Sequence, residues 1–246
     1  MHTSPEIIQP EQTESTSSHL KEILKQQELP ECSVVITSRQ TAGRGQPGNT
    51  WASNPGENLT FSMVFYPDMV EAPRQFIISK TVAVAITNVL EPIIPGVSIK
   101  WPNDIFFQNQ KLGGILIENS LSGPKISQSI AGIGININQT SFPGTLSNPI
   151  SLQNITGKKH DLPSLFERIF DSLIEQYALL IQGKTEATEE KYHNRLFRKR
   201  GWHKYKDAGG EFMARFSEIG PAGHLFLERK DGTISRYAFK EVEFVL

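Results

Sequence analysis

The run Lys111-Leu112-Gly113-Gly114-Ile115-Leu116-Ile117-Glu118 decides the fold, because it combines the apolar pattern of a strand with two adjacent glycines. Glycine inside a strand often marks the close approach of a ligand or of another backbone. A Ser122-Gly123-Pro124 turn follows, and a second strand-like run returns over 125–138. We therefore expect a long hairpin built from strands over 112–121 and 125–138, with a ligand or another backbone close to its glycines. An ordinary strand-end lysine is the competing interpretation of Lys111.

The returning strand contains Ala131-Gly132-Ile133-Gly134-Ile135-Asn136-Ile137-Asn138, in which small residues alternate with larger ones. Alternate small residues share one face of a strand and leave room there for a flat group. Asn136 is polar in an otherwise apolar run, and a buried asparagine needs hydrogen-bond partners. Ordinary core packing is the competing interpretation of this segment.

The pattern on either side of the hairpin predicts a mixture of strands and helices. We expect short strands over 33–37, 59–66, 97–101 and 105–107, with a hairpin turn at Asn109-Gln110. We expect helices over 19–27, 73–90, 161–182 and 186–194. Residues 139–160 are rich in Asn, Pro, Ser and Gly and predict an extended connection.

The tail differs from the rest of the chain, because short strand-like runs alternate with Gly and Asp turns from about residue 197. We expect a small antiparallel barrel there. The 246 residues therefore divide into a larger domain, 1–195, and a small β domain, 196–246. Strands mixed with segregated helices and followed by a β unit define an α+β protein.

The bulk composition excludes several classes of protein. The formal net charge is −1 and the sequence pI is about 6.6, so there is no broad positive field for non-specific nucleic-acid binding, although a local basic patch lies around Arg195 to Lys206. The single cysteine, Cys32, forms neither an intramolecular disulfide nor a Cys-based zinc site, and a buried thiol there suits a cytoplasmic protein. We find neither a signal-peptide pattern nor an apolar run long enough to span a membrane.

The segment 40–51 is a glycine-rich loop, and its Gly43, Gly45 and Gly48 formally match the dinucleotide-binding spacing. That motif must follow a strand directly and open a helix, whereas prolines here oppose a helix. We expect instead a loop that orders around phosphates, with Arg44 neutralising charge and Trp51 stacking on a base. A flexible surface loop is the alternative.

A second polar segment, Lys100-Trp101-Pro102-Asn103-Asp104, lies where a short strand ends. A lysine and an aspartate this close could serve phosphate and metal or amine binding, although Asn-Asp after Pro is also ordinary turn chemistry. We find no Walker A sequence, no Gly-x-Ser-x-Gly elbow and no His pairing typical of a zinc site.

Taken together and in this order, these four segments resemble the biotin protein ligase family, in its monofunctional form without an N-terminal DNA-binding domain. The motifs span 40–138, and the likeness extends to the helices and the small barrel. The resemblance implies a class II synthetase-like catalytic domain, with a mixed sheet flanked by helices, followed by an SH3-like β-barrel.

The resemblance also implies residue roles. The catalytic residues are Arg44, Lys111 and Asp104, and Asp104 is also a possible Mg²⁺ ligand. Lys111 bridges the biotin carboxylate and the α-phosphate. The predicted biotin pocket is lined by Ser15, Thr16, Ser17 and Gln40. Predicted contacts with ATP or the adenylate come from Gly43, Arg44, Gly45, Gln46, Trp51, Lys100, Asn103, Gly113, Gly114, Gly132, Gly134 and Asn136.

Three positions depart from the family pattern. Ser17 replaces an asparagine, and Gln46 and Asn49 replace two arginines of the family loop. Two charges that would hold an anionic intermediate are therefore missing from the loop. This departure predicts weaker retention of the intermediate.

The implied activity is ATP- and Mg²⁺-dependent formation of biotinyl-5′-AMP, followed by transfer of biotin to a lysine of a biotin carboxyl carrier protein domain. We expect a monomer or homodimer that binds neither DNA nor membranes. A lipoate or octanoate protein ligase or transferase is the nearest alternative. A DNA-binding repressor is disfavoured because only residues 1–14 precede the first motif. A catalytically inactive binding protein is disfavoured because Arg44 and Lys111 are present.

Overall fold

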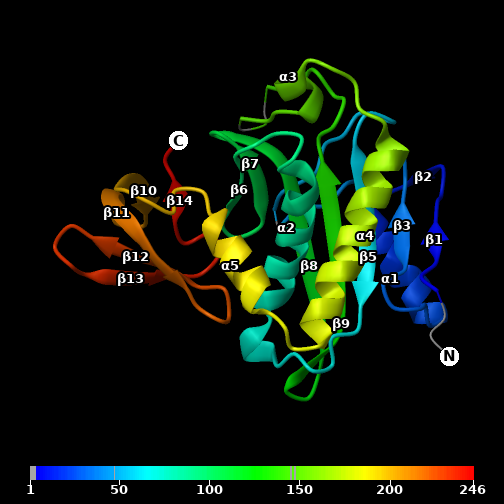
Figure 1. Ribbon diagram of the computed structural model, residues 1–246, viewed down its shortest axis with the longest axis horizontal. Coiled ribbons are helices and arrows are strands. Elements are labelled where there is room, and N and C mark those ends of the chain that lie inside the picture. Colours follow the sequence, from blue (N-terminus) through cyan, green and yellow to red (C-terminus); the bar gives the residue numbers. More distant parts are fainter. Residues whose placement is uncertain (1–3, 47, 145, 147) are drawn as a thin grey trace.

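The computed structural model describes residues 4–46, 48–144, 146 and 148–246, and a seven-stranded sheet forms its centre (Figure 1). The strand order is β1-β3-β5-β9-β8-β7-β6, with β1 and β3 parallel and the other neighbours antiparallel. The strands span Ile7–Ile8, Val34–Ile36, Leu59–Phe65, Lys125–Ile135, Gln110–Ser122, Asp104–Phe107 and Val97–Lys100 in that order. A two-stranded parallel ribbon pairs β2 (Gln12–Thr13) with β4 (Arg39–Gln40).

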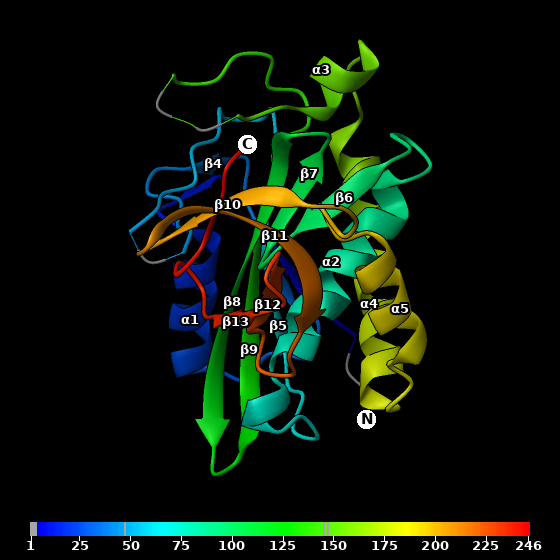
Figure 2. The same cartoon turned by 90° about the vertical axis from the view of Figure 1, so that its left-hand side faces the viewer.

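Helices cover both faces of this sheet, and Figure 2 shows them on opposite sides of it. Helix α1 (Thr16–Gln26) packs on β3, β5 and β9 from one face. Helices α2 (Phe76–Leu90) and α4 (Leu162–Ile181) pack together on the other, with α5 (Glu186–Asn194) against α2. None of the helices in the described part of the chain has the length and apolar character needed to cross a bilayer.

Strand β5 explains how one sheet serves two apolar layers, because all seven of its residues are buried. Side chains alternate between the faces of a strand. Phe61 and its alternate neighbours belong to the main core beneath α2 and α4, whereas Val64 belongs to a smaller cluster with Leu20 of α1. A strand covered on both faces has a nearly continuous apolar sequence, which is what made this segment easy to recognise.

The glycine-bearing segments form the predicted hairpin, made of strands β8 and β9. The two strands pair antiparallel over most of their length, and Gly114 lies directly opposite Gly134. Strand β9 ends at Ile135, three residues before the predicted end at 138. Asn136 and Asn138 lie beyond it, and their backbone N–H groups donate to the carbonyls of Leu112 in β8 and Glu57 respectively.

Several local predictions were wrong. The connection 139–160 contains a short helix, α3 (Leu152–Thr156), which begins with a reciprocal Ser151–Asn154 capping box. Helix α1 begins at Thr16, capped by the Ser15 hydroxyl, rather than at residue 19. The hairpin turn lies at Gln108 and Asn109, one residue earlier than expected. The two-residue strands β1, β2 and β4 were missed because so short a pattern carries no periodicity.

Cys32 is buried, as predicted, with 6% of its surface exposed. Burial raises the pKa of the Cys32 thiol to about 12, and the neighbouring Glu31 carboxylate adds to the shift. A thiol with a raised pKa is a poor nucleophile near neutral pH, which agrees with a structural role.

The C-terminal unit is a five-stranded antiparallel sheet with the order β13-β12-β11-β10-β14. Its strands, from β10 to β14, span His203–Asp207, Gly210–Ile219, Leu225–Arg229, Ile234–Tyr237 and Glu243–Phe244. The unit packs on the larger part through Trp101, which donates a hydrogen bond to the Gly223 carbonyl at 2.8 Å and contacts the Phe239 ring. The α+β architecture with a small SH3-like unit is therefore confirmed, and we propose the division into domains 1–195 and 196–246.

We expect Phe61→Ala to lower the free energy of unfolding by about 3–5 kcal/mol, because it removes a fully buried ring from the core. The ring also packs edge-on against Phe166 at a centroid separation of 5.2 Å. Urea denaturation followed by circular dichroism would measure the change. The control, Ile7→Ala on the exposed edge strand, should cost about 0.5 kcal/mol or less. Equal effects would contradict this description of the core.

Candidate functional site

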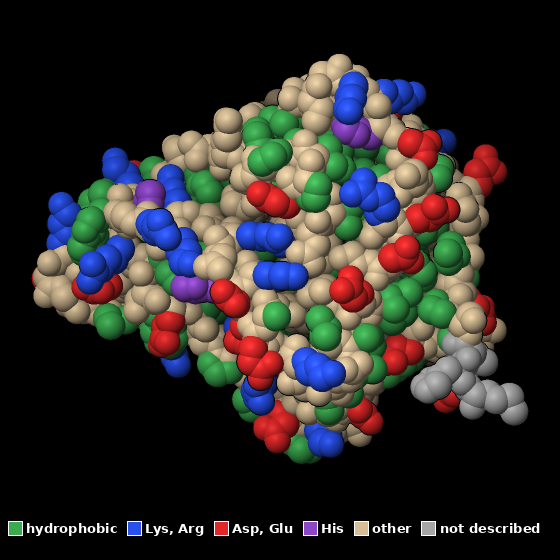
Figure 3. All heavy atoms as spheres, viewed as in Figure 1, with side chains coloured by type: hydrophobic (Ala, Val, Ile, Leu, Met, Phe, Trp, Pro, Cys, Tyr) green, Lys and Arg blue, Asp and Glu red, His purple; other side chains and the backbone are tan. Residues whose placement is uncertain are grey.

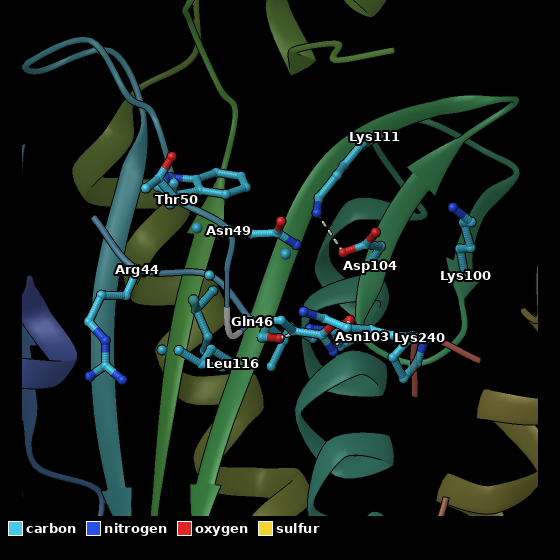
Figure 4. Close-up of a pocket in the computed structure, with 18 of the residues that line it drawn as sticks. Arg44, Gln46, Asn49, Thr50, Lys100, Asn103, Asp104, Lys111, Leu116 and Lys240 are labelled. Carbon is cyan, nitrogen blue, oxygen red and sulfur yellow. Dashed lines mark hydrogen bonds and ion pairs between the residues drawn. The ribbon is translucent and has the colours of Figure 1, made fainter. Parts of the chain in front are cut away.

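A cavity of about 640 Å³ opens on the α1 face of the sheet, beyond the N-terminus of α1 (Figure 4). Four segments far apart in the sequence form its walls: the start of α1, the glycine loop, the 101–104 turn and the end of the C-terminal unit. Its floor is the glycine-bearing part of β8 and β9. A volume of this size is typical of a site for small organic ligands.

The floor is flat because three residues without side chains face the cavity. A Cβ on Gly134 would lie 2.3 Å from the Trp51 ring, and a Cβ on Gly132 would lie 2.5 Å from the Ser17 hydroxyl. Gly114 is also in contact distance of Trp51 and of the Lys111 side chain. The flat group expected above these glycines is therefore, in this structure, the indole of Trp51.

A hydroxyl-rich corner forms where α1 begins. The backbone N–H of Thr16 donates to the Gln40 side-chain carbonyl at 2.8 Å. The hydroxyls of Thr16 and Ser17 both lie within hydrogen-bond distance of the Ser62 hydroxyl, at 2.8 and 2.9 Å. These groups are buried, so they form a preorganised set of donors and acceptors at one end of the cavity.

The opposite wall carries charge. The Lys111 ammonium lies 2.7 Å from the Asp104 carboxylate, and both side chains remain partly exposed. Figure 4 shows this ion pair projecting between β8 and β7. The backbone of Lys111 is fixed as well, because its N–H donates to the Asn148 carbonyl and its own carbonyl accepts from Ile150. The lysine is thus held at a defined position at the start of the strand.

Lys100 lies on the same wall, over the rings of Phe106 and Phe244 at 4.8 and 5.2 Å from their centroids. Burial lowers the pKa of the Lys100 ammonium. The positive charges of Lys111 and Arg198 lower it further, whereas Asp104 opposes the shift. The Lys100 amine therefore loses its proton at a lower pH than free lysine does.

Arg44 turns away from the Lys111–Asp104 pair, as Figure 4 shows. Its guanidinium donates to Glu118 at 2.8 Å, and the same carboxylate accepts from Lys21 at 2.6 Å. Two further loop residues that line the cavity, Gln46 and Asn49, are neutral. Gln46 donates to the Asn103 side-chain carbonyl at 3.3 Å, and Asn49 closes a turn of the loop through its backbone. Arg44, the cation of the loop, is therefore paired with Glu118 of β8.

Most of the predicted site residues share this cavity. Fifteen line its wall: Ser15, Thr16, Ser17, Gln40, Arg44, Gly45, Gln46, Trp51, Lys100, Asn103, Asp104, Lys111, Gly114, Gly132 and Gly134. Gly43, Gly113 and Asn136 do not line it. Gly43 and Gly113 allow close backbone packing, and the Asn136 amide donates to the Ile150 carbonyl at 3.1 Å. The buried Asn136 side chain thus finds its hydrogen-bond partner in a backbone carbonyl, as a buried amide requires.

Sequence reasoning missed three groups of site residues. Ser62 was overlooked, although it is a hydroxyl residue of the buried strand β5 and bonds to Thr16 and Ser17 of the cavity wall. Glu118 was taken only as part of an apolar strand. Lys240, Val242, Glu243, Phe244 and Leu246 reach the cavity from the C-terminal unit, and only the docking of the two units places them there.

No cluster of three or more His, Cys, Asp or Glu suited to a metal exists in the part of the chain that the structure describes. Asp104 is the carboxylate beside Lys111, and Glu243 is a second acid on the cavity wall. Mg²⁺ usually needs only one or two carboxylates when a nucleotide supplies phosphate oxygens. The acids present therefore fit a metal that arrives bound to a nucleotide, not a resident metal centre.

Comparison with known proteins agrees with this geometry. The model of the biotin/lipoate A/B protein ligase family matches residues 9–136, which include the glycine loop, the 101–104 turn and the β8–β9 hairpin. The chain belongs to the biotin/lipoate A/B protein ligase family. Its relatives include the bifunctional ligase/repressor BirA of Bacillus spizizenii, 34% identical over 155 residues, covering 60% of this chain and 46% of that protein. Another is the biotin–[acetyl-CoA-carboxylase] ligase of Paracoccus denitrificans, 31% identical over 134 residues, covering 52% of this chain and 55% of that protein.

The likeness to solved ligase structures extends over nearly the whole chain. The biotin protein ligase of Aquifex aeolicus in complex with biotin and ATP superposes with a TM-score of 0.79 and 25% identity, covering 97% of each chain. By contrast, the chain spans about half the length of the curated relatives that it matches. The structural agreement therefore includes the C-terminal unit, which lies outside the family match.

We expect Gly134→Val to displace Trp51 from the cavity floor, because even a Cβ at this position overlaps the indole. The result should be altered fluorescence of Trp51 and loss of nucleotide binding, measured by titration with ATP. The matched control is Gly144→Val, since a Cβ on Gly144 meets no atom within 4 Å. If the Gly134→Val protein binds ATP as well as the wild type does, nucleotide binding does not depend on the position of the Trp51 indole against Gly134.

Proposed function

We propose that this chain is a biotin protein ligase that forms biotinyl-5′-AMP and transfers biotin to a lysine of a biotin carboxyl carrier protein domain. The observation that carries the proposal is Lys111, which is held 2.7 Å from Asp104 above the glycine floor of a single cavity. The neutral hydroxyl corner at Thr16 and Ser17 suits an uncharged polar ring, and the cationic wall suits carboxylate and phosphate. Family membership and the ligand-bound Aquifex neighbour support the same activity.

In the first step, a carboxylate oxygen of biotin forms a bond to the α-phosphorus of ATP. The bond from that phosphorus to the bridging oxygen breaks, and pyrophosphate leaves. Two anions must approach each other, so cations that face the reacting groups lower the barrier. Lys111 is placed to contact both groups, and Arg44 joins them once it leaves Glu118.

In the second step, a neutral lysine amine of the acceptor attacks the acyl carbon of the mixed anhydride. The acyl–oxygen bond to AMP breaks, an amide forms and AMP leaves. The amine must lose a proton, and Asp104 is the carboxylate on the wall that can orient or accept it. Lys100, whose pKa is lowered by burial, stays beside the leaving phosphate as a positioning cation.

Mg²⁺ bound to ATP would neutralise charge on the phosphates. Asp104 would contribute the protein carboxylate nearest to it.

A lipoate or octanoate ligase or transferase is the competing function within the same family. The two are separated by supplying biotin and lipoate in turn to the same protein preparation.

The experiment that tests this function is biotin-dependent exchange of pyrophosphate into ATP, with purified protein and Mg²⁺. We expect exchange with biotin and none with lipoate. Lys111→Ala should reduce the exchange rate by about 10²–10³-fold, because one transition-state charge contact is lost. The control is Lys25→Ala, an exposed lysine on α1 away from the cavity, which should leave the rate unchanged. Exchange that requires lipoate, or a Lys111→Ala rate within a few-fold of wild type, would refute the assignment.

Gln46→Arg should slow dissociation of the adenylate about tenfold, since a charge-assisted bond to phosphate exceeds a neutral one by about 1–1.5 kcal/mol. Gln46 and Asn49 both face the cavity, so Asn49→Arg in addition should slow release further. Gln27→Arg adds the same charge at the far end of α1 and should have no effect. Chasing labelled adenylate with unlabelled biotin and ATP would measure the rate. Unchanged release in both cavity variants would show that these positions do not reach the phosphate.

A further inference from the structure

A second hollow, of about 780 Å³, lies beside the junction of the two units. Its wall comes from the β7–β8 turn, the end of α5 and the connection that leads into β10. The lining residues are Asn109, Asn194, Leu196, Phe197, Arg198, Lys199, Arg200 and His203. Three of these are permanent cations and none is acidic. Figure 3 shows Lys, Arg and His side chains gathered over this part of the molecule.

The positive charge here is a local feature, because the chain as a whole has a formal net charge of −1. Lys199 donates to the Asn194 side chain at 2.7 Å, so its partner is neutral. The Arg200 side chain makes no hydrogen bond or ion pair with any part of the chain that the structure describes. The hollow therefore presents cations whose charge is not neutralised within the described molecule.

The hollow adjoins the catalytic cavity through one layer of aromatic rings. Phe197, which lines the hollow, packs against Phe106 and Phe244 at centroid separations of 5.4 and 6.2 Å. Lys100 lies on the other side, over the same two rings. The positive charge of Arg198 also contributes to the lowered pKa of the Lys100 ammonium.

Arg198 links the hollow to the cavity wall in a second way. Its backbone adopts a left-handed conformation, with φ of 56°, which is uncommon for a residue that carries a side chain. Its guanidinium donates to the carbonyls of Lys204 and Val245, at 3.0 and 2.8 Å. Val245 lies between Phe244 and Leu246, two residues of the cavity wall. The basic segment is thus fixed to the wall that the reaction uses.

We propose that this basic hollow docks the acceptor protein, by binding acidic side chains next to the acceptor lysine. The proposal rests on the ligase activity proposed above. A lysine that enters the cavity near Asp104 brings its own polypeptide to the rim, and the hollow is the adjoining surface on the Lys100 side. Cations that face an acidic partner speed and orient encounter, while the cavity selects the reacting amine.

A folded acidic protein fits better than nucleic acid. Tight binding of nucleic acid uses many phosphate contacts along an extended basic surface. Here three cations gather in one hollow, and Lys204, just outside it, is paired with Glu211. Phe197 is the aromatic residue among those that line the hollow. Its ring already packs against Phe106, Phe244 and Arg198, so it is not free to stack on a base.

The test is a double charge reversal, Lys199→Glu with Arg200→Glu, and the probe is a biotin carboxyl carrier protein domain. We expect the KM for the carrier to rise about tenfold, with biotin-dependent pyrophosphate exchange unchanged. Exchange needs no acceptor, so normal exchange also shows that the variant is folded. The matched control is Lys158→Glu with Lys159→Glu, another adjacent pair of exposed cations, in the loop before α4. This control should leave the KM unchanged.

A second arm changes the carrier instead of the enzyme. Replacing the carrier's acidic side chains beside the lysine with Asn or Gln should raise the KM for wild type but not raise it further for the double variant. An unchanged KM in the double variant, with normal exchange, would overturn the docking proposal alone. An unchanged KM together with lost affinity for a single-stranded oligonucleotide would overturn it in favour of nucleic acid. Absence of exchange in wild type would instead refute the ligase activity.

Discussion

The cross-strand pair of Gly114 and Gly134 is the constraint on which the rest of the site depends. Because neither residue carries a side chain, the Trp51 indole lies directly on the sheet, and the glycine loop that carries Trp51 closes over the same floor. Gly132 extends the floor to the hydroxyls at the start of α1. The β8–β9 pairing therefore fixes the depth of the cavity, and the other segments supply its chemistry from the edges.

In this structure, the cations of the site form ion pairs with carboxylates of the protein itself. Asp104 holds Lys111, and Glu118 holds both Arg44 and Lys21. Ion pairs that remain partly exposed to solvent contribute little to stability, so exchanging an anionic ligand for a carboxylate would have a small cost. Glu118 lies on the same strand as Lys111, seven residues further along. One strand thus carries Lys111 and also holds the loop arginine away from the Lys111–Asp104 pair.

The sequence predicted the parts of the fold whose patterns are long and locally determined. The hairpin of β8 and β9, the apolar strand β5 and the helix from Asp161 were recognisable because burial imposes a regular period on them. The cavity residues were recognisable because Lys111, Arg44 and the glycines fall in four ordered motifs. Ser62 and Lys240 were not, because the contact of Ser62 with Thr16 depends on how α1 packs on β5, and the place of Lys240 in the cavity depends on the docking of the C-terminal unit. The short helix α3 was hidden by turn-forming residues that also serve as helix caps.

The most direct test of the account is the identity of the small molecule that the protein makes and holds. Purified protein would be incubated with biotin, lipoate, ATP and Mg²⁺ together, separated from free ligands by gel filtration, denatured and examined by mass spectrometry. The account predicts biotinyl-5′-AMP in the protein fraction, since the hydroxyl corner and the Lys111–Asp104 wall are placed to bind its two ends. Lipoyl-5′-AMP as the retained product, or the absence of any acyl adenylate, would contradict it.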